Sequence, residues 1–147
     1  MMKLVTDPNI IGHGLWLSIH FKAKHATTEE AKKEFIDYMY LLSIEFPCGK
    51  CRTHIQEYLE THPFTDFLNM KDEKGQQIGM LKWSWLFHNT VNLRLHKPFV
   101  NWQTAVAMFN TDGQPCESCM IKPDEKVLKS YNEKNKIVNG YFMKRNI

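Results

Sequence analysis

The chain has 147 residues, enough for one domain with a hydrophobic core, and 43% of them are hydrophobic, which excludes a disordered chain. Its 19 basic and 16 acidic residues give a formal net charge of +3, too balanced to indicate a partner made of nucleic acid. The sequence has no apolar run of the length of a membrane span or a secretory leader, so it predicts a cytoplasmic protein without a membrane span.

The first half of the chain predicts two helices. Apolar residues recur at steps of three and four in segment 12–25, the spacing of a buried helical face. Thr27 and Glu30 have the spacing of a capping box, and a long amphipathic pattern follows them. Pro47 ends this second helix, because proline cannot donate to the helical hydrogen-bond ladder.

Three more helices are expected in the second half. They run from about Cys48 to His62, from Met80 to His96 before Pro98, and from about Trp102 to Phe109, and a turn-rich segment separates the first two. Helices joined by short connections predict an all-α protein, a four-helix bundle with a short fifth helix. We divide the chain into an N-terminal segment (1–11), a helical domain (12–110) and a C-terminal arm (111–147).

All four cysteines lie in two C-x-x-C pairs, Cys48/Cys51 and Cys116/Cys119, a pattern typical of redox or metal chemistry. Cys48 opens a predicted helix, where free N–H groups and the helix dipole stabilise a thiolate. A thiolate is the species that attacks disulfides, so this position favours thiol–disulfide exchange.

Three other interpretations stay open at this point. A thioredoxin-like fold would place a β-strand before the first pair, whereas a helix is predicted there. A four-cysteine zinc module is possible in principle, but residues 52–115 separate the pairs, far more than in a zinc ribbon. The third alternative is a helical interaction domain that has no catalytic activity.

The predicted fourth helix has an unusual face. At steps of three and four it carries Trp85, His88, Val91, Asn92 and Leu95. A core stripe should be apolar, yet this one contains an imidazole and an amide, and Asn89 and Lys97 flank it. Core residues bonded to each other would explain such a pair, but so many polar groups favour a large planar cofactor that carries phosphates.

Three motifs in this order resemble the Erv-type FAD-linked sulfhydryl oxidases. They are Gly12-x-x-x-Trp16-x-x-Ile19-His20, Pro47-Cys48-x-x-Cys51-x-x-His54 and His88-Asn89-x-Val91-Asn92-x-x-Leu95-x-Lys97-Pro98. The resemblance covers roughly residues 12–110. It implies a bundle that binds FAD at its mouth, and usually a homodimer.

The resemblance also implies roles for residues. Cys51 would lie beside the flavin ring as the thiolate that contacts it, and Cys48 would be the interchange cysteine. The FAD site would be lined by Gly12, His13, Trp16, His20, Cys51, His54, His88, Asn89, Val91, Asn92, Leu95, Lys97 and Trp102. Metal ligands are not expected in this site.

The implied activity is disulfide formation in thiol-containing protein substrates. Electrons would pass from a substrate dithiol, directly or through a thioredoxin-like relay protein, to Cys116–Cys119 as a shuttle dithiol, and then to Cys48–Cys51. The flavin would pass them to dioxygen, with release of hydrogen peroxide. The alternative for Cys116 and Cys119 is a structural disulfide that holds the C-terminal arm.

The sequence departs from the family pattern in places. His13 stands where the family commonly has arginine, and Ile19 where it has leucine. The additional disulfide of larger cellular members, near the His-Asn helix, is absent. The chain therefore looks like the minimal versions of large DNA viruses, which would place it in host cytoplasm or the virion; the mitochondrial intermembrane space is the alternative.

Overall fold

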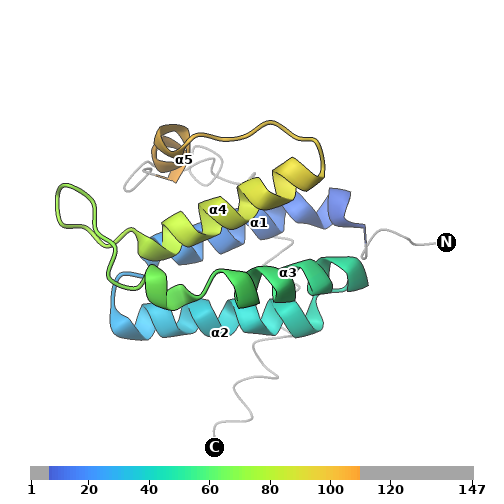
Figure 1. Ribbon diagram of the computed structural model, residues 1–147, viewed down its shortest axis with the longest axis horizontal. Helices are drawn as coiled ribbons and strands as arrows, with labels where there is room; N and C mark the ends of the chain where they lie inside the picture. Colours follow the sequence, from blue (N-terminus) through green and yellow to red (C-terminus); the bar gives the residue numbers. More distant parts are fainter. Residues whose placement is uncertain (1–6, 110–147) are drawn as a thin grey trace, which may run out of the picture. The chain divides into compact units, whose positions relative to one another are not determined.

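The computed structural model describes residues 7–109 (Figure 1). Its elements are α1 (Pro8–His25), α2 (Glu29–Glu45), α3 (Gly49–Thr61), the 3-10 helix η1 (Phe64–Asp66), α4 (Gly79–Arg94) and α5 (Trp102–Phe109). Within this range the only β-type pairing is an isolated bridge between Lys71 and Gln77, so the all-α prediction is confirmed. No helix in the described range has both the length and the apolar character to span a membrane. The whole predicted C-terminal arm (111–147), with Cys116 and Cys119, lies outside the described residues.

The apolar pattern predicted that the first helix begins near residue 12, but α1 begins at Pro8. The carboxylate of Asp7 accepts a hydrogen bond from the amide of Asn9 at 2.9 Å and caps the helix. Pro8 occupies the first helical position, where its fixed φ fits a helix and its missing N–H costs nothing. The start signal therefore lies upstream of the first buried residues.

Helix α2 is capped one residue later than predicted. Thr28, not Thr27, accepts the amide hydrogen bond of Ala31, at 3.2 Å through its hydroxyl oxygen. The amide of Thr27 donates to the carbonyl of His25 at 2.9 Å, so Thr27 belongs to the turn between the helices. The predicted capping box of Thr27 and Glu30 is wrong for this reason.

The helices pack in two pairs, α1 with α4 and α2 with α3, and α5 crosses the pair α1–α4 on its outer side (Figure 1). Helix α1 also contacts α2, which joins the two pairs. The core between them contains Ile19, Ala23, Phe35, Met39, Ile55, Tyr58, Leu59, Met80, Trp83 and Phe87. The arrangement is the four-helix bundle with a fifth helix that the sequence predicted.

Helix α4 is buried on more than one side, because the bundle lies on one face and α5 with its connecting segment on another. Its N-terminus is fixed by a close approach: a Cβ on Gly79 would lie 1.7 Å from the carbonyl oxygen of Phe67. Trp83 is fully buried, and its indole N–H donates to the carbonyl of His62 at 2.9 Å. Polar side chains on α4 are thus held in fixed positions inside the protein.

Helix α4 ends at Arg94, earlier than the predicted end at His96. His96 takes a left-handed backbone conformation with φ of 55°, and the amide of Lys97 donates to the carbonyl of Asn92 at 2.8 Å. These features match the Schellman type of helix end, which is usually built with glycine. The chain then turns back along α4 toward α5 (Figure 1).

Candidate active site

The first cysteine pair lies at the N-terminus of α3. Cys48 is the N-cap residue of this helix, and its sulfur accepts the amide hydrogen bond of Cys51 at 3.3 Å. Both cysteines are free thiols in this structure, and both are half-buried. The helix therefore places one sulfur at its positive end and the other one turn further in.

The two thiols differ in acidity. The thiol of Cys51 donates a hydrogen bond to Cys48, and together with the amide of Cys51 and the charge of Arg52 this lowers the pKa of Cys48. Burial and the neighbouring Cys48 raise the pKa of Cys51 to about 11, although the positive charge of Arg94 opposes this shift. Of the two thiols, Cys48 is therefore the one that loses its proton first, and Cys51 is the one that keeps it. Arg94, which the sequence analysis did not select, is the charge that favours ionisation of Cys51.

A second polar cluster lies between α1 and α4. The ring of His20 contacts the hydroxyl of Ser84 through Nδ1 at 2.9 Å and Nδ1 of His88 through Nε2 at 2.9 Å. Ser84 is fully buried and donates to the carbonyl of Leu81 at 2.9 Å. His88, on the unusual face of the predicted fourth helix, is therefore hydrogen-bonded to His20 of the first motif.

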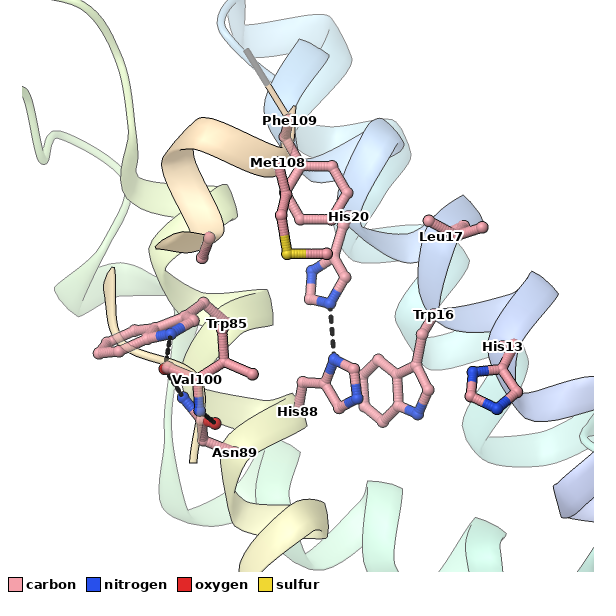
Figure 2. Close-up of a pocket in the computed structure, with 11 residues that line it drawn as sticks. His13, Trp16, Leu17, His20, Trp85, His88, Asn89, Val100, Met108 and Phe109 are labelled. Carbon is pink, nitrogen blue, oxygen red and sulfur yellow. Dashed lines mark hydrogen bonds between the residues drawn. The ribbon is translucent and has the colours of Figure 1, made fainter. Parts of the chain in front are cut away.

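Trp16 covers this cluster. Its indole stacks on the ring of His88, with 4.0 Å between ring centroids and 3° between the planes. Figure 2 shows Trp16 alongside His88, with the dashed hydrogen bond from His88 to His20. Phe109 of α5 covers His20 from another side, at 4.9 Å between centroids. The cluster offers flat, partly apolar surfaces with a few polar atoms, as a planar ligand requires.

Both imidazoles are uncharged at neutral pH. Burial, with a contribution from His88, lowers the pKa of His20 to about 3. Burial, with the charges of Lys97 and His13, lowers the pKa of His88 to about 4. In the unfolded chain both rings take up a proton near the ordinary value of 6.5, so between pH 6.5 and pH 4 the unfolded state binds protons that the folded state does not.

Acidification will therefore destabilise the fold. We expect the free energy of unfolding to fall by about 5 kcal/mol between pH 6.5 and pH 4, roughly half of it from each ring, measured by urea unfolding. The variant His88→Gln should lose less than wild type over this range, whereas His25→Gln, which alters an exposed histidine of α1, should follow wild type. Equal losses in His88→Gln and wild type would contradict the assignment.

A pocket opens beside the cluster, with a volume of about 160 Å³. The predicted site residues that line it are His13, Trp16, His20, His88 and Asn89. The sequence analysis missed the other lining residues, which are Leu17, Trp85, Val100, Ala105, Met108 and Phe109. Trp85 belongs to the stripe noted on the fourth helix, but no signal in the sequence placed α5 and Val100 against it.

Asn89 has a structural role in this pocket. Its side-chain amide donates to the carbonyl of Val100 at 2.9 Å, and its side-chain oxygen accepts the amide of Val100 at 3.0 Å. The indole N–H of Trp85 donates to the same carbonyl at 2.7 Å. Asn89 lines the pocket, and its hydrogen bonds hold Val100, on the outer wall of the pocket, against α4 (Figure 2).

The remaining predicted residues do not line this pocket; they are Gly12, Cys51, His54, Val91, Asn92, Leu95, Lys97 and Trp102. Cys51 and Val91 pack against the hydrophobic core, and Leu95 is exposed just after α4. Trp102 packs against Trp85 at 5.4 Å between centroids, and the ammonium group of Lys82 lies over both indoles. Their predicted contacts with a cofactor stay predictions.

One of these residues, His54, has a buried polar atom without a partner in the described part of the chain. Nδ1 of His54 is buried and accepts or donates no hydrogen bond there. Buried polar groups normally have partners, so Nδ1 of His54 is suited to bind a polar group of a ligand. Asn92 is nearly buried as well.

A metal centre finds no support among residues 7–109, where no group of three or more His, Cys, Asp or Glu side chains could hold an ion. A four-cysteine zinc site would also need Cys116 and Cys119, which lie outside this range.

These features define a helical-bundle protein with a helix-terminal dithiol and a pocket of aromatic and histidine side chains. The model of the Erv1 / Alr family matches residues 13–112, and the chain belongs to this family.

Named relatives include plant and viral proteins. The chain is 24% identical over 121 residues to "FAD-linked sulfhydryl oxidase ERV1" of rice, which covers 80% of this chain and 58% of the rice protein. It is 31% identical over 94 residues to "FAD-linked sulfhydryl oxidase" of African swine fever virus (isolate Pig/Kenya/KEN-50/1950), which covers 62% of this chain and 72% of the viral protein. It is 30% identical over 90 residues to "FAD-linked sulfhydryl oxidase ERV1" of Arabidopsis thaliana. This match covers 59% of this chain and 43% of the Arabidopsis protein. The chain thus spans just over half of the rice protein and less of the Arabidopsis one.

Proposed function

We propose that this chain is an FAD-linked sulfhydryl oxidase that makes disulfides in thiol-containing proteins. The observation that carries the proposal is the dithiol geometry: Cys48, with the lower pKa, caps the N-terminus of α3, and Cys51, with its pKa raised by burial, lies one turn further in. A pair of metal-binding cysteines or a pair of inert core cysteines needs no such difference in pKa between its two thiols. The names of the plant and viral relatives support both the cofactor and the reaction.

The residues present fit FAD. Trp16 and His88 offer a flat stacked surface at the pocket, and the unpartnered Nδ1 of His54 offers a hydrogen bond. Lys97 adds a positive charge near His88 that suits a phosphate group. These residues would hold the cofactor, and when bound it accepts two electrons from the dithiol and passes them to dioxygen, which gives hydrogen peroxide.

The protein's own residues carry out the exchange. A substrate thiolate attacks the sulfur of Cys48 in the oxidised pair, the Cys48–Cys51 bond breaks, and Cys51 leaves as a thiolate that Arg94 favours. A second substrate thiolate then attacks the substrate sulfur of this mixed disulfide. The substrate disulfide is released, and Cys48 leaves as a thiolate. Because the pKa of Cys48 is lowered, it is a good leaving group in this step.

Two further parts of the proposal rest on the sequence alone. Cys116–Cys119 acts as a shuttle dithiol between substrate and Cys48, and the chain works as a homodimer. Both agree with the resemblance described above, and Cys116 and Cys119 lie outside the described residues.

Purification tests the proposed function directly. The protein should be yellow, with flavin absorption in the visible range, and should consume dioxygen and produce peroxide when given dithiothreitol or a reduced unfolded protein. Colourless protein that contains stoichiometric zinc would favour the zinc module instead. Colourless protein without zinc or turnover would favour the interaction domain.

A further inference from the structure

The buried hydroxyl of Ser84 determines where its neighbours carry their protons. Its oxygen lies 2.9 Å from the carbonyl oxygen of Leu81 and 2.9 Å from Nδ1 of His20. Two oxygens this close repel unless a hydrogen lies between them, so the hydroxyl donates to the carbonyl. Its lone pair is then left for His20, and the hydrogen in that contact belongs to Nδ1 of the ring.

The same reasoning extends to His88. A neutral imidazole carries one N–H, and the low pKa values of both rings keep them neutral at pH 7. With its proton on Nδ1, His20 has a lone pair on Nε2. The contact of 2.9 Å with Nδ1 of His88 is then a hydrogen bond donated by His88, which leaves Nε2 of His88 as a lone pair. No described residue bonds that nitrogen, and the ring lines the pocket (Figure 2).

We propose that Ser84 is a positioning residue that acts through His20 to make His88 a hydrogen-bond acceptor toward the bound cofactor. This inference rests on the proposed function. It requires that the part of the cofactor that meets His88 carries an N–H or O–H group, such as an exocyclic amine, an imide or a sugar hydroxyl. A carbonyl or phosphate oxygen at that position would face a lone pair and be repelled.

Removal of the hydroxyl should reverse the chain of hydrogen bonds. In Ser84→Ala, Nδ1–H of His20 would be buried without an acceptor, which is costly. The ring avoids this by carrying its proton on Nε2 and donating to Nδ1 of His88. The proton of His88 then moves to Nε2, so that a donor replaces the acceptor that the cofactor meets.

The test combines imidazole ¹⁵N NMR of the cofactor-free protein at neutral pH with titration of FAD. Wild type should show the proton on Nδ1 in both His20 and His88. Ser84→Ala should show it on Nε2 in both, and should bind FAD about tenfold more weakly. Ser84→Thr keeps a hydroxyl and should restore the wild-type pattern.

Thr90→Ala is the matched control, because Thr90 on the same helix also donates its hydroxyl to a backbone carbonyl, that of Leu86 at 3.0 Å, but at an exposed position. It should change neither readout. A wild-type spectrum with the His88 proton on Nε2 would overturn the inference, even if Ser84→Ala does not fold. So would tautomers that stay unchanged in a folded Ser84→Ala. The predicted tautomers in a protein that binds no FAD would instead refute the proposed function and the assigned use of the acceptor.

Discussion

Cys51→Ala will abolish turnover while FAD stays bound. Without Cys51 the Cys48–Cys51 disulfide cannot form, so a substrate thiolate has no disulfide sulfur to attack, and the two-electron transfer from the pair cannot take place. We expect peroxide production with dithiothreitol to fall by about a thousandfold or more, as when a nucleophile is removed from other enzymes that form covalent intermediates. The assay is dioxygen consumption at saturating dithiol, with flavin absorbance measured on the same sample.

Two variants make this result specific. Cys48→Ala should be equally inactive, because it removes the other half of the pair. Thr53→Ala is the control, since Thr53 is exposed on the same turn of α3 and its hydroxyl only donates to the carbonyl of Gly49, at 3.3 Å. It should keep wild-type turnover within about twofold. Normal dioxygen consumption by Cys51→Ala would remove Cys51 from the reaction.

Trp16→Ala should largely lose the cofactor. The indole of Trp16 forms the stacked face over His88 and also contacts Phe87 edge-on at 5.2 Å between centroids. Its removal opens the pocket beside His88 and deletes a large aromatic contact surface. We expect FAD to bind at least about thirtyfold more weakly, a value that corresponds to roughly 2 kcal/mol. Titration of the flavin by fluorescence gives the dissociation constant.

Trp16→Phe and Leu17→Ala separate this effect from general damage to the pocket. Phenylalanine keeps an aromatic face and should recover most of the affinity. Leu17 lines the same pocket but is 50% exposed, so its truncation should cost less than threefold. Thermal unfolding followed by circular dichroism shows whether the cofactor-free variants are folded. A folded Trp16→Ala that binds FAD as wild type does would exclude Trp16 from the site.

The helices were predictable because their buried faces repeat at helical spacing, and the errors lie at their ends. Apolar residues indicate which face is buried but not where the backbone enters a helix. Helix α1 starts upstream of the apolar pattern because Asp7 caps it and the fixed φ of Pro8 fits its first position. Thr27 and Thr28 are both capping residues by type, and only the backbone turn decides between them. His96 ends α4 in a conformation that residue type would assign to glycine.

The site was predictable where its residues lie on one helix or in a motif. The structure brings His20, His88 and Trp16 into contact, although these direct contacts could not be read from spacing, and their contact with a cofactor stays a prediction. Ser84 was missed, yet it lies four residues before His88 and therefore on the same helical face, which was a usable signal. Phe109 reaches the pocket only through the path of the chain after α4, which local pattern does not determine.

The paired hydrogen bonds between Asn89 and Val100 have a consequence for the kinetics of cofactor binding. The segment after α4 is fastened to the helix that carries His88, so it does not have to be ordered when a ligand arrives. Binding to a preorganised wall avoids part of the entropic cost that a loose loop would add, and this favours slow release of the ligand. We therefore expect Asn89 to slow the release of a bound cofactor by holding this wall in place, whether or not it contacts the cofactor itself.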